Sequence, residues 1–353
     1  MHGFIRVAAA VPRVKVADIE ANSREIISLM KEAEAREVAI VVFPELSLTA
    51  YTCGDLFFQD TLHCALDKML RHLLAQTRSL QTLAVIGAPL WYRNRLYNCA
   101  IAIQRGKVLG VVPKSFLANH KEFYEKRWFR SGLELRDATM HIAGEDVPFG
   151  PDLIFGKKIR FGVEICEDLW SVRPPSSMQA INGALILCNL SASNELVSKA
   201  AYRRELVTHQ SARTVSAYIY ASAGVHESTS DLVYSGDALI AENGTLLARN
   251  PRYQRESSLI TADIDTQKLT YYRLIETYYA DTQSTPFRVV PIFPLKQIIK
   301  ILRRYDPLPF VPKNASLQHE ICEDIFMMQA SGLATRIEFI GRTRPVIGIS
   351  GGL

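Results

Sequence analysis

The chain has 353 residues, of which 48% are hydrophobic and 22% charged, so it is too long for one typical compact domain and too apolar to be mostly disordered. No run of about 18 apolar residues occurs, and Arg6 and Pro12 interrupt the apolar start, so we expect a soluble protein without a membrane span or a secretory signal. The net charge is +5, of which residues 286–353 carry +4, with nine Lys and Arg against five Asp and Glu. Residues 1–285 carry only +1, so we expect no basic face for nucleic acid on this larger part.

Apolar runs rich in β-branched residues recur through the first 285 residues. They predict strands that are buried on at least one face. These runs are residues 4–10, 38–43, 83–87, 98–103, 108–112, 159–165 and 184–188.

Helical patterns and tight turns lie between and after these strands. Asp18 can cap a helix with one apolar stripe, and residues 199–215 form another helical pattern. Arg105-Gly106 and Asn243-Gly244 each predict the turn of a β-hairpin. Because hairpins interrupt the alternation of strands and helices, we expect an α/β protein with mixed sheets rather than a purely parallel, doubly wound one.

The composition changes at residue 286. Six of the sixteen prolines fall within residues 286–312, which is typical of an extended connector. After it, Ser316 can cap a helix, and residues 346–349 read as a strand that runs into Ser350-Gly351-Gly352. One helix and one strand cannot bury their own apolar faces, so a second domain is expected to start here and to be incomplete. The predicted division is 1–285, 286–313 and 314–353.

Three predicted strands end on residues that can carry chemistry. Glu45 follows the strand at 38–43, Lys114 follows the strand at 108–112, and Cys166 follows the strand at 159–165 beside Glu167 and Asp168. Each residue alone has an ordinary interpretation, as a solvated carboxylate, a surface lysine and a packed thiol. Together they supply a base, a cation and a nucleophile, which amide hydrolysis through a covalent intermediate requires.

The other five cysteines read as small packed residues. No CxxC pair and no Cys and His at the spacing of metal ligands are present, so we expect no disulfide scaffold and no metal. A reducing, cytoplasmic location is the expectation that fits this cysteine usage.

The order of these motifs is similar to that of the nitrilase, or carbon–nitrogen hydrolase, superfamily, whose signature is a Glu, Lys, Cys triad in this chain order. Four segments resemble the glutaminase domain of the glutamine-dependent NAD synthetase family over about residues 1–285. They are PELSLTAYTCGDLF (44–57), PKSFLANHKEFYEKRWF (113–129), CEDLW (166–170) and NLSAS (189–193).

The resemblance implies a four-layer α-β-β-α sandwich for the first domain, and roles for its residues. By this transfer Glu45 is the general base, Lys114 the electrostatic partner and Cys166 the nucleophile. Glu122 corresponds to the superfamily's second, supporting glutamate, and the backbone N–H of Glu167 is expected to help hold the oxyanion.

The resemblance also implies the contacts to glutamine. They map onto His120, Ser193 and Lys199, with Tyr51 lining the pocket. His120 stands where Tyr is usual, and Lys199 where Arg is frequent. Lys199 can still pair with the α-carboxylate of glutamine, although without the bidentate fork of Arg.

The C-terminal segment resembles the opening of the family's ATP pyrophosphate loop, with Ser350, Gly351 and Gly352 as its first residues. This implies the first helix and strand of an incomplete α/β ATP-pyrophosphatase-type domain. In the full-length enzyme, ammonia would serve the ATP- and Mg²⁺-dependent amidation of nicotinic acid adenine dinucleotide to NAD, whereas the glutaminase reaction needs no cofactor. We expect this chain not to carry out the synthetase reaction. Its expected partners are glutamine, the synthetase domain and further copies of the chain in a homo-oligomer. The sequence leaves open how strongly the glutaminase and synthetase sites are coupled.

Two other functions remain possible from the sequence. A free-standing amidase or nitrilase would act on another carbon–nitrogen bond, but Ser193, Lys199 and the synthetase-like C-terminal segment argue against it. A non-catalytic scaffold would have no need of intact Glu45, Lys114 and Cys166.

Overall fold

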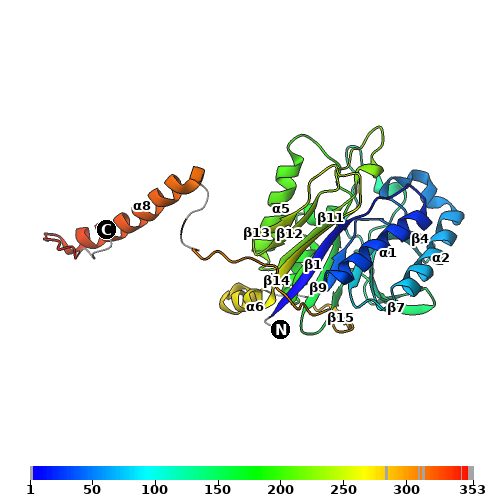
Figure 1. The fold of residues 1–353 in the computed structure, drawn as a ribbon, viewed down its shortest axis with the longest axis horizontal. Helices are drawn as coiled ribbons and strands as arrows, with labels where there is room; N and C mark the ends of the chain where they lie inside the picture. Colours follow the sequence, from blue (N-terminus) through cyan, green and yellow to red (C-terminus); the bar gives the residue numbers. More distant parts are fainter. Residues whose placement is uncertain (1–2, 283–284, 309–310, 312–314, 343, 349–353) are drawn as a thin grey trace. The chain divides into compact units, whose positions relative to one another are not determined.

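The structure is a computed structural model that describes residues 3–282, 285–308, 311, 315–342 and 344–348. The chain forms two compact units, of which the first extends to Leu302 and the second begins at Arg303. The first unit is a mixed α/β fold with two β-sheets (Figure 1). No helix among the described residues has the length and apolar character needed to cross a membrane.

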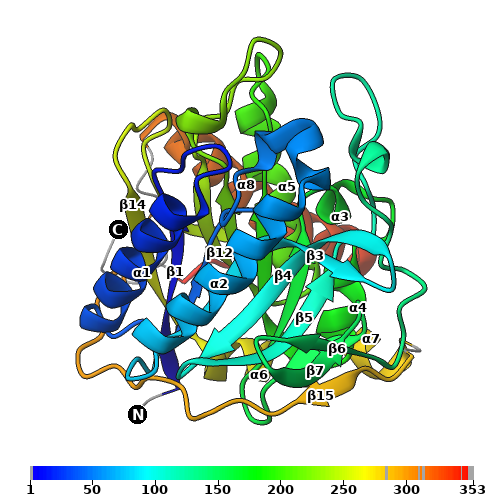
Figure 2. The ribbon, with the colours of Figure 1, turned by 90° about the vertical axis from the view of Figure 1, so that its right-hand side faces the viewer.

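The first sheet has eight strands within the described residues. Their order across the sheet is β14 (Ser258–Asp265), β1 (Phe4–Val11), β2 (Ile40–Val42), β3 (Leu83–Tyr92), β4 (Arg95–Gln104), β5 (Lys107–Pro113), β7 (Glu145–Phe149) and β6 (Ala138–Ile142). β2 is parallel to β3, and β3, β4 and β5 follow one another antiparallel. β2 and β5 therefore run in the same direction and bring their C-terminal ends to one edge. Figure 2 shows β3, β4 and β5 side by side in this sheet.

The second sheet has seven strands within the described residues. Their order is β13 (Thr245–Arg249), β12 (Ala238–Glu242), β11 (Ala217–Ser222), β10 (Ala184–Ser191), β9 (Arg160–Ile165), β8 (Leu153–Phe155) and β15 (Arg288–Val290). β9, β10 and β11 are parallel, so the residues that follow β9 and β10 also share an edge.

The helices flank these sheets and fill the connections. The α-helices are α1 (Ile19–Ala35), α2 (Asp60–Gln76), α3 (Glu167–Trp170), α4 (Pro175–Ile181), α5 (Lys199–Arg213), α6 (Thr266–Ile275), α7 (Tyr278–Asp281) and α8 (Ala315–Ile340), and the 3₁₀ turns are η1 (Tyr51–Phe58), η2 (Glu125–Arg127) and η3 (Val225–Glu227). α1 and α2 lie on one side of the two sheets and α5 on the other (Figure 1).

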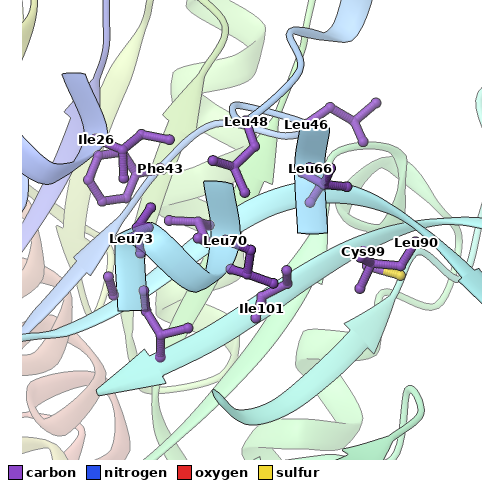
Figure 3. Close-up of a cluster of buried hydrophobic side chains, with 14 of the residues drawn as sticks. Ile26, Phe43, Leu46, Leu48, Leu66, Leu70, Leu73, Leu90, Cys99 and Ile101 are labelled. Atoms are coloured by element: carbon purple, nitrogen blue, oxygen red, sulfur yellow. The ribbon is translucent and has the colours of Figure 1, made fainter. Parts of the chain in front are cut away.

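Three apolar clusters hold the first unit together. In the first, α1 and α2 pack on the outer face of the first sheet, as Figure 3 shows for Ile26, Leu70 and Ile101. The second lies between the sheets and includes Val42 and Val163. The third joins α5 to the outer face of the second sheet. Because hydrophobic contact is non-directional, these clusters stabilise the layers without by themselves fixing how one sheet is aligned on the other.

Most of the predicted elements of the first unit are confirmed. Every predicted strand overlaps an observed strand, although β2 covers only residues 40–42 of the predicted 38–43 and β9 begins at Arg160 rather than Ile159. Both hairpins form, β4–β5 and β12–β13. The Asp18 side chain accepts the N–H of Ala21 and caps α1, and α5 occupies the second predicted helix.

The C-terminal expectations differ from the structure in three places. Part of the expected connector is a strand, because Arg288–Val290 pairs in parallel with β8, which offers it an open edge. α8 begins at Ala315, so Ser316 lies inside the helix rather than at its cap. Residues 346–348 form no strand, since a single short segment has no partner strand to bond, and Ile349 to Gly352 lie outside the described residues.

Candidate active site

A cavity of about 280 Å³ opens at the edge where β9 and β10 end. Its wall includes the loop after β5, the residues that follow β9, and the start of α5. The polar and nucleophilic side chains that line it include those of His120, Glu122, Cys166, Ser193, Asn194 and Lys199.

Glu45 is carried to this edge by β2 and is completely buried. Its Oε1 accepts hydrogen bonds from Nδ2 of Asn98 and Nζ of Lys114, both at 2.6 Å. Its Oε2 has no hydrogen-bond partner among the described residues. One oxygen therefore anchors the carboxylate, and the other is left to accept a proton.

Lys114 follows β5 and is also completely buried. Its Nζ lies 2.6 Å from Glu45 Oε1 and 2.7 Å from Glu125 Oε1. Burial alone would lower the pKa of Lys114, but the Glu125 and Glu45 carboxylates outweigh it and hold this pKa well above its usual value. The lysine is therefore a fixed positive charge.

Glu125 completes this charge cluster. Its Oε1 accepts from Lys114 and from the hydroxyl of Tyr51 at 2.7 Å, and its Oε2 accepts the N–H of Ala118 at 3.2 Å. Burial raises the pKa of Glu125 to about 7, against the opposing effect of Lys114. Two carboxylates and one ammonium thus share a site closed to solvent.

Cys166 lies at a sharp turn between β9 and α3. Its backbone has φ 47° and ψ −100°, a conformation that residues with a Cβ rarely adopt. Burial raises the pKa of its thiol, the Glu45 carboxylate raises it further, and Lys114 opposes both. A thiol in this environment is protonated at neutral pH, so it needs a base at the moment of attack.

Lys199 forms the cationic wall of the cavity. Its Nζ donates to Asn194 Oδ1 at 2.5 Å, and it lies 5.4 Å from the ring centroid of Trp170 and 6.0 Å from that of Phe123. Burial lowers the pKa of Lys199 from its usual value. The ammonium has one side-chain hydrogen-bond acceptor among the described residues, which leaves donor capacity for an anion in the cavity.

Comparisons with known proteins identify the family. The sequence model of the family described as carbon-nitrogen hydrolase matches residues 6–274. The chain belongs to this family.

Relatives of this carbon–nitrogen hydrolase include longer proteins. The chain is 39% identical to the glutamine-dependent NAD(+) synthetase of Mycobacterium tuberculosis over an alignment of 364 residues. This alignment covers 100% of this chain and 54% of that protein. It is 30% identical over 281 residues to the protein of the same name from Bos taurus, covering 76% of this chain and 39% of the other. The chain therefore spans about half the length, or less, of these curated relatives.

Solved structures agree on the fold. A glutamine-dependent NAD(+) synthetase from Cytophaga hutchinsonii has a TM-score of 0.68 and 32% identity, over 74% of this chain and 43% of that one. Saccharomyces cerevisiae Nit3, a member of the nitrilase superfamily, has a TM-score of 0.60 over 77% of this chain and 94% of that one, at 18% identity.

The structure brings together most of the residues that the sequence singled out. Glu45 and Lys114 are in direct contact, and Cys166 lines the cavity together with Ser193 and Lys199. His120 lies at the same cavity, with Nε2 3.2 Å from Glu167 Oε1.

Glu122 does not lie where the resemblance to the nitrilase superfamily places it. It lines the cavity and accepts a hydrogen bond from Asn194, while Glu125 contacts Lys114. The reason is local: residues 117–124 form no helix, and the N–H of Glu125 donates to Ala118 O, which folds the loop back and presents residue 125 to the lysine.

Tyr51 also lies differently from the expectation. Its hydroxyl donates to Glu125, and it lines a separate cavity of about 90 Å³ instead of the one at Cys166.

Sequence reasoning missed two residues that contact the charge cluster of this candidate site, Asn98 and Glu125. Asn98 had a usable signal, since a polar residue inside an apolar strand is buried and must find a partner. Glu125 and Glu122 are both plausible by spacing, and only the fold of the loop separates them.

Proposed function

We propose that this chain is a glutamine amidohydrolase, the ammonia-supplying part of a glutamine-dependent NAD synthetase. The observation that carries the proposal is Glu45, whose Oε1 is fixed by Asn98 and Lys114 while its Oε2 has no hydrogen-bond partner among the described residues. A buried carboxylate with one anchored and one open oxygen is suited to take a proton from a thiol and later from water.

In the proposed first step, Glu45 takes the proton of Cys166 as the sulfur attacks the side-chain amide carbon of glutamine. The new C–S bond places negative charge on the amide oxygen, which Lys114 and the backbone N–H of Glu167 stabilise. The C–N bond then breaks, protonated Glu45 returns its proton to the leaving nitrogen, and ammonia departs from a thioester.

The second step reverses these roles with water. Glu45 removes a proton from a water molecule, whose oxygen attacks the thioester carbon. The C–S bond breaks, glutamate leaves, and the thiolate recovers the proton from Glu45.

Recognition of glutamine is proposed to use the charged walls of the cavity. Lys199 pairs with the α-carboxylate, and Ser193 and His120 supply hydrogen bonds at the positions that line the same cavity. Glu122 and Glu167 supply the negative charge that suits an α-ammonium group.

We further propose the wider setting of this reaction. In the whole protein, the ammonia serves the ATP- and Mg²⁺-dependent amidation of nicotinic acid adenine dinucleotide, in the cytoplasm and in a homo-oligomer. Residues 1–285 are proposed as the glutaminase domain with α-β-β-α layering, 286–313 as a connector whose residues 288–290 add strand β15 to the second sheet, and 314–353 as the start of the synthetase domain. The three apolar clusters support the layering. Ser350, Gly351 and Gly352 lie outside the described residues, and their role in binding ATP stays a prediction.

The test compares the wild-type chain with Cys166→Ala and with Cys188→Ala, a matched variant because Cys188 is also buried but does not line the cavity. Glutamate release from glutamine should disappear in the first variant and persist in the second. Added hydroxylamine should intercept the thioester as glutamyl hydroxamate. Glutamate release by Cys166→Ala at the wild-type rate would refute the covalent route.

A further inference from the structure

Asp168 is a buried carboxylate that the proposed reaction does not use. It lies two residues after Cys166, in the first turn of α3, and only 1% of it is exposed. Its Oδ2 accepts the N–H of Ile165 at 2.9 Å, and its Oδ1 accepts the N–H groups of Phe116 at 2.7 Å and Ser115 at 3.1 Å. Three backbone donors thus converge on one side chain.

These donors come from different sheets. Ile165 is the last residue of β9, in the second sheet, and directly precedes Cys166. Ser115 and Phe116 follow Lys114 at the end of β5, in the first sheet. Asp168 therefore joins the two sheets at the strand ends that carry the nucleophile and the ammonium.

The other directional contacts that cross here among the described residues are made farther along the loop after β5, where His120 meets Glu167 and Glu122 accepts from Asn194, or are long. The layer between the sheets is apolar, and the backbone N–H of Glu45 donates to Ser191 O across the sheets at a long 3.3 Å. Apolar contact sets the spacing of the sheets but is tolerant of small slides, whereas hydrogen bonds have a preferred geometry.

We propose that Asp168 is a positioning residue, which fixes Lys114 relative to Cys166 by binding the backbone on both sides of the gap between the sheets. This inference rests on the proposed function, since it assigns Asp168 a part in the same reaction. Asp168 does not touch the reacting atoms; it acts through the backbone next to them.

A carboxylate is suited to this place in a way that its amide is not. An ionised carboxyl group only accepts hydrogen bonds, and each of its two oxygens faces at least one N–H. In Asp168→Asn, one of these oxygens becomes an NH₂ group that points at a backbone N–H. Either the bond to Ile165 in the second sheet is lost, or the link to the first sheet is reduced to the long 3.4 Å contact between the Ser115 N–H and Oδ2.

The experiment measures glutamine turnover and the reactivity of Cys166 in Asp168→Asn. We expect kcat to fall at least tenfold with KM within about twofold of the wild type. The rate of alkylation of Cys166 by iodoacetamide, followed from pH 6 to 10, should shift to higher pH because Lys114 no longer stabilises the thiolate.

The direction of this shift separates two roles. The groups that act on the thiol are Glu45, Lys114 and Glu125, with Lys199 on the cavity side. Burial raises the pKa of Asp168 well above its usual value, against the N–H groups of Ile165 and Phe116 and the charge of Lys114. Loss of the charge of an ionised Asp168 would by itself favour the thiolate and move the profile to lower pH, and loss of a protonated Asp168 would leave the profile in place. A shift to higher pH is therefore the signature of a displaced lysine.

Glu164→Gln is the matched control. Glu164 lies two residues before Cys166, is equally buried, and binds the N–H of Ser176 and the hydroxyl of Tyr218 on the other side of β9. The Glu164→Gln variant should lose stability without a change in kcat or in the alkylation profile of Cys166. If Asp168→Asn matches this control in both measurements, the proposal is overturned.

Two further results keep the test decisive. If Asp168→Asn does not fold, Asp168→Glu replaces it, since the extra methylene cannot fit a fully packed site without moving one backbone segment. A wild-type kcat and a wild-type alkylation profile in Asp168→Glu overturn the proposal. If the wild type is alkylated but releases no glutamate, the proposed function fails, and the alkylation profiles of the variants still decide the role of Asp168.

Discussion

Removal of Lys114 should leave two buried carboxylates without their cation. Its Nζ lies 2.6 Å from Glu45 Oε1 and 2.7 Å from Glu125 Oε1, and all three side chains are completely shielded from solvent. In Lys114→Met, two carboxylates remain in one closed site without a cation. Removing one partner of a buried ion pair costs about 3–5 kcal/mol, so the apparent Tm should fall by roughly 6–10 °C at about 2 °C per kcal/mol.

The pH dependence of this loss follows from Glu125. Its pKa is already raised by burial to about 7, above the ordinary value of 4.5, and it should rise further without Lys114. A carboxyl group whose pKa is higher in the folded state destabilises that state increasingly as pH rises towards the folded pKa. In the wild type this loss of stability levels off near pH 7, the folded pKa of Glu125. In the variant, where that pKa is higher, the loss continues above pH 7. The difference in unfolding free energy between wild type and variant should therefore widen above pH 7 by up to about 1.4 kcal/mol per pH unit.

Thermal and urea unfolding at pH 6, 7, 8 and 9 measure this effect. Lys107→Met is the control, because Lys107 lies on the same strand and makes an exposed ion pair with Glu145, which should cost under about 1 kcal/mol at every pH. Lys114→Met with Glu125→Gln should recover most of the stability while remaining inactive towards glutamine. A deficit that shrinks as pH rises, or no recovery in the double variant, would refute this account of the cluster.

Two further predictions concern the base and the substrate. Gly87→Ala should lower glutaminase activity at least tenfold and destabilise the fold by about 1–3 kcal/mol. The new Cβ would lie 2.2 Å from the backbone N of Leu46 and would displace Glu45. Gly332→Ala in α8 is the control: its Cβ meets no atom within 4 Å, so activity should be unchanged in the same assay. Lys199→Met should raise KM for glutamine about tenfold or more but leave KM for 4-aminobutanamide, which has no α-carboxylate, nearly unchanged; equal effects on both substrates in steady-state kinetics would remove Lys199 from carboxylate binding.

The strands next to the site could be predicted because their sequences are locally decisive. Apolar, β-branched runs ending in Glu45, Lys114 and Cys166 identify both the strands and the groups at their ends. β14 has no such signal: it is mostly half-buried, and it pairs with β1 across some 250 residues of chain. Long-range pairing of this kind depends on the finished sheet rather than on the local sequence.

The site residues that escaped prediction do so for a related reason. Glu122 and Glu125 are equally good carboxylates three residues apart, and an irregular loop decides which one meets Lys114. Asp168 binds backbone N–H groups, which every sequence offers, so nothing in its own pattern indicates its partners. Spacing along a strand is predictable from the sequence, whereas the path of a loop and bonds to the backbone require the fold.

The turn at Cys166 has a consequence for how the protein would respond to selection. A residue with a Cβ at φ 47° and ψ −100° costs of the order of 1–3 kcal/mol, a cost that glycine largely avoids. Cys166→Gly should therefore fold more stably than the wild type while losing its nucleophile. A laboratory screen that rewards only heat resistance would drive this position towards glycine, so a search for more robust variants has to select for activity in the same round.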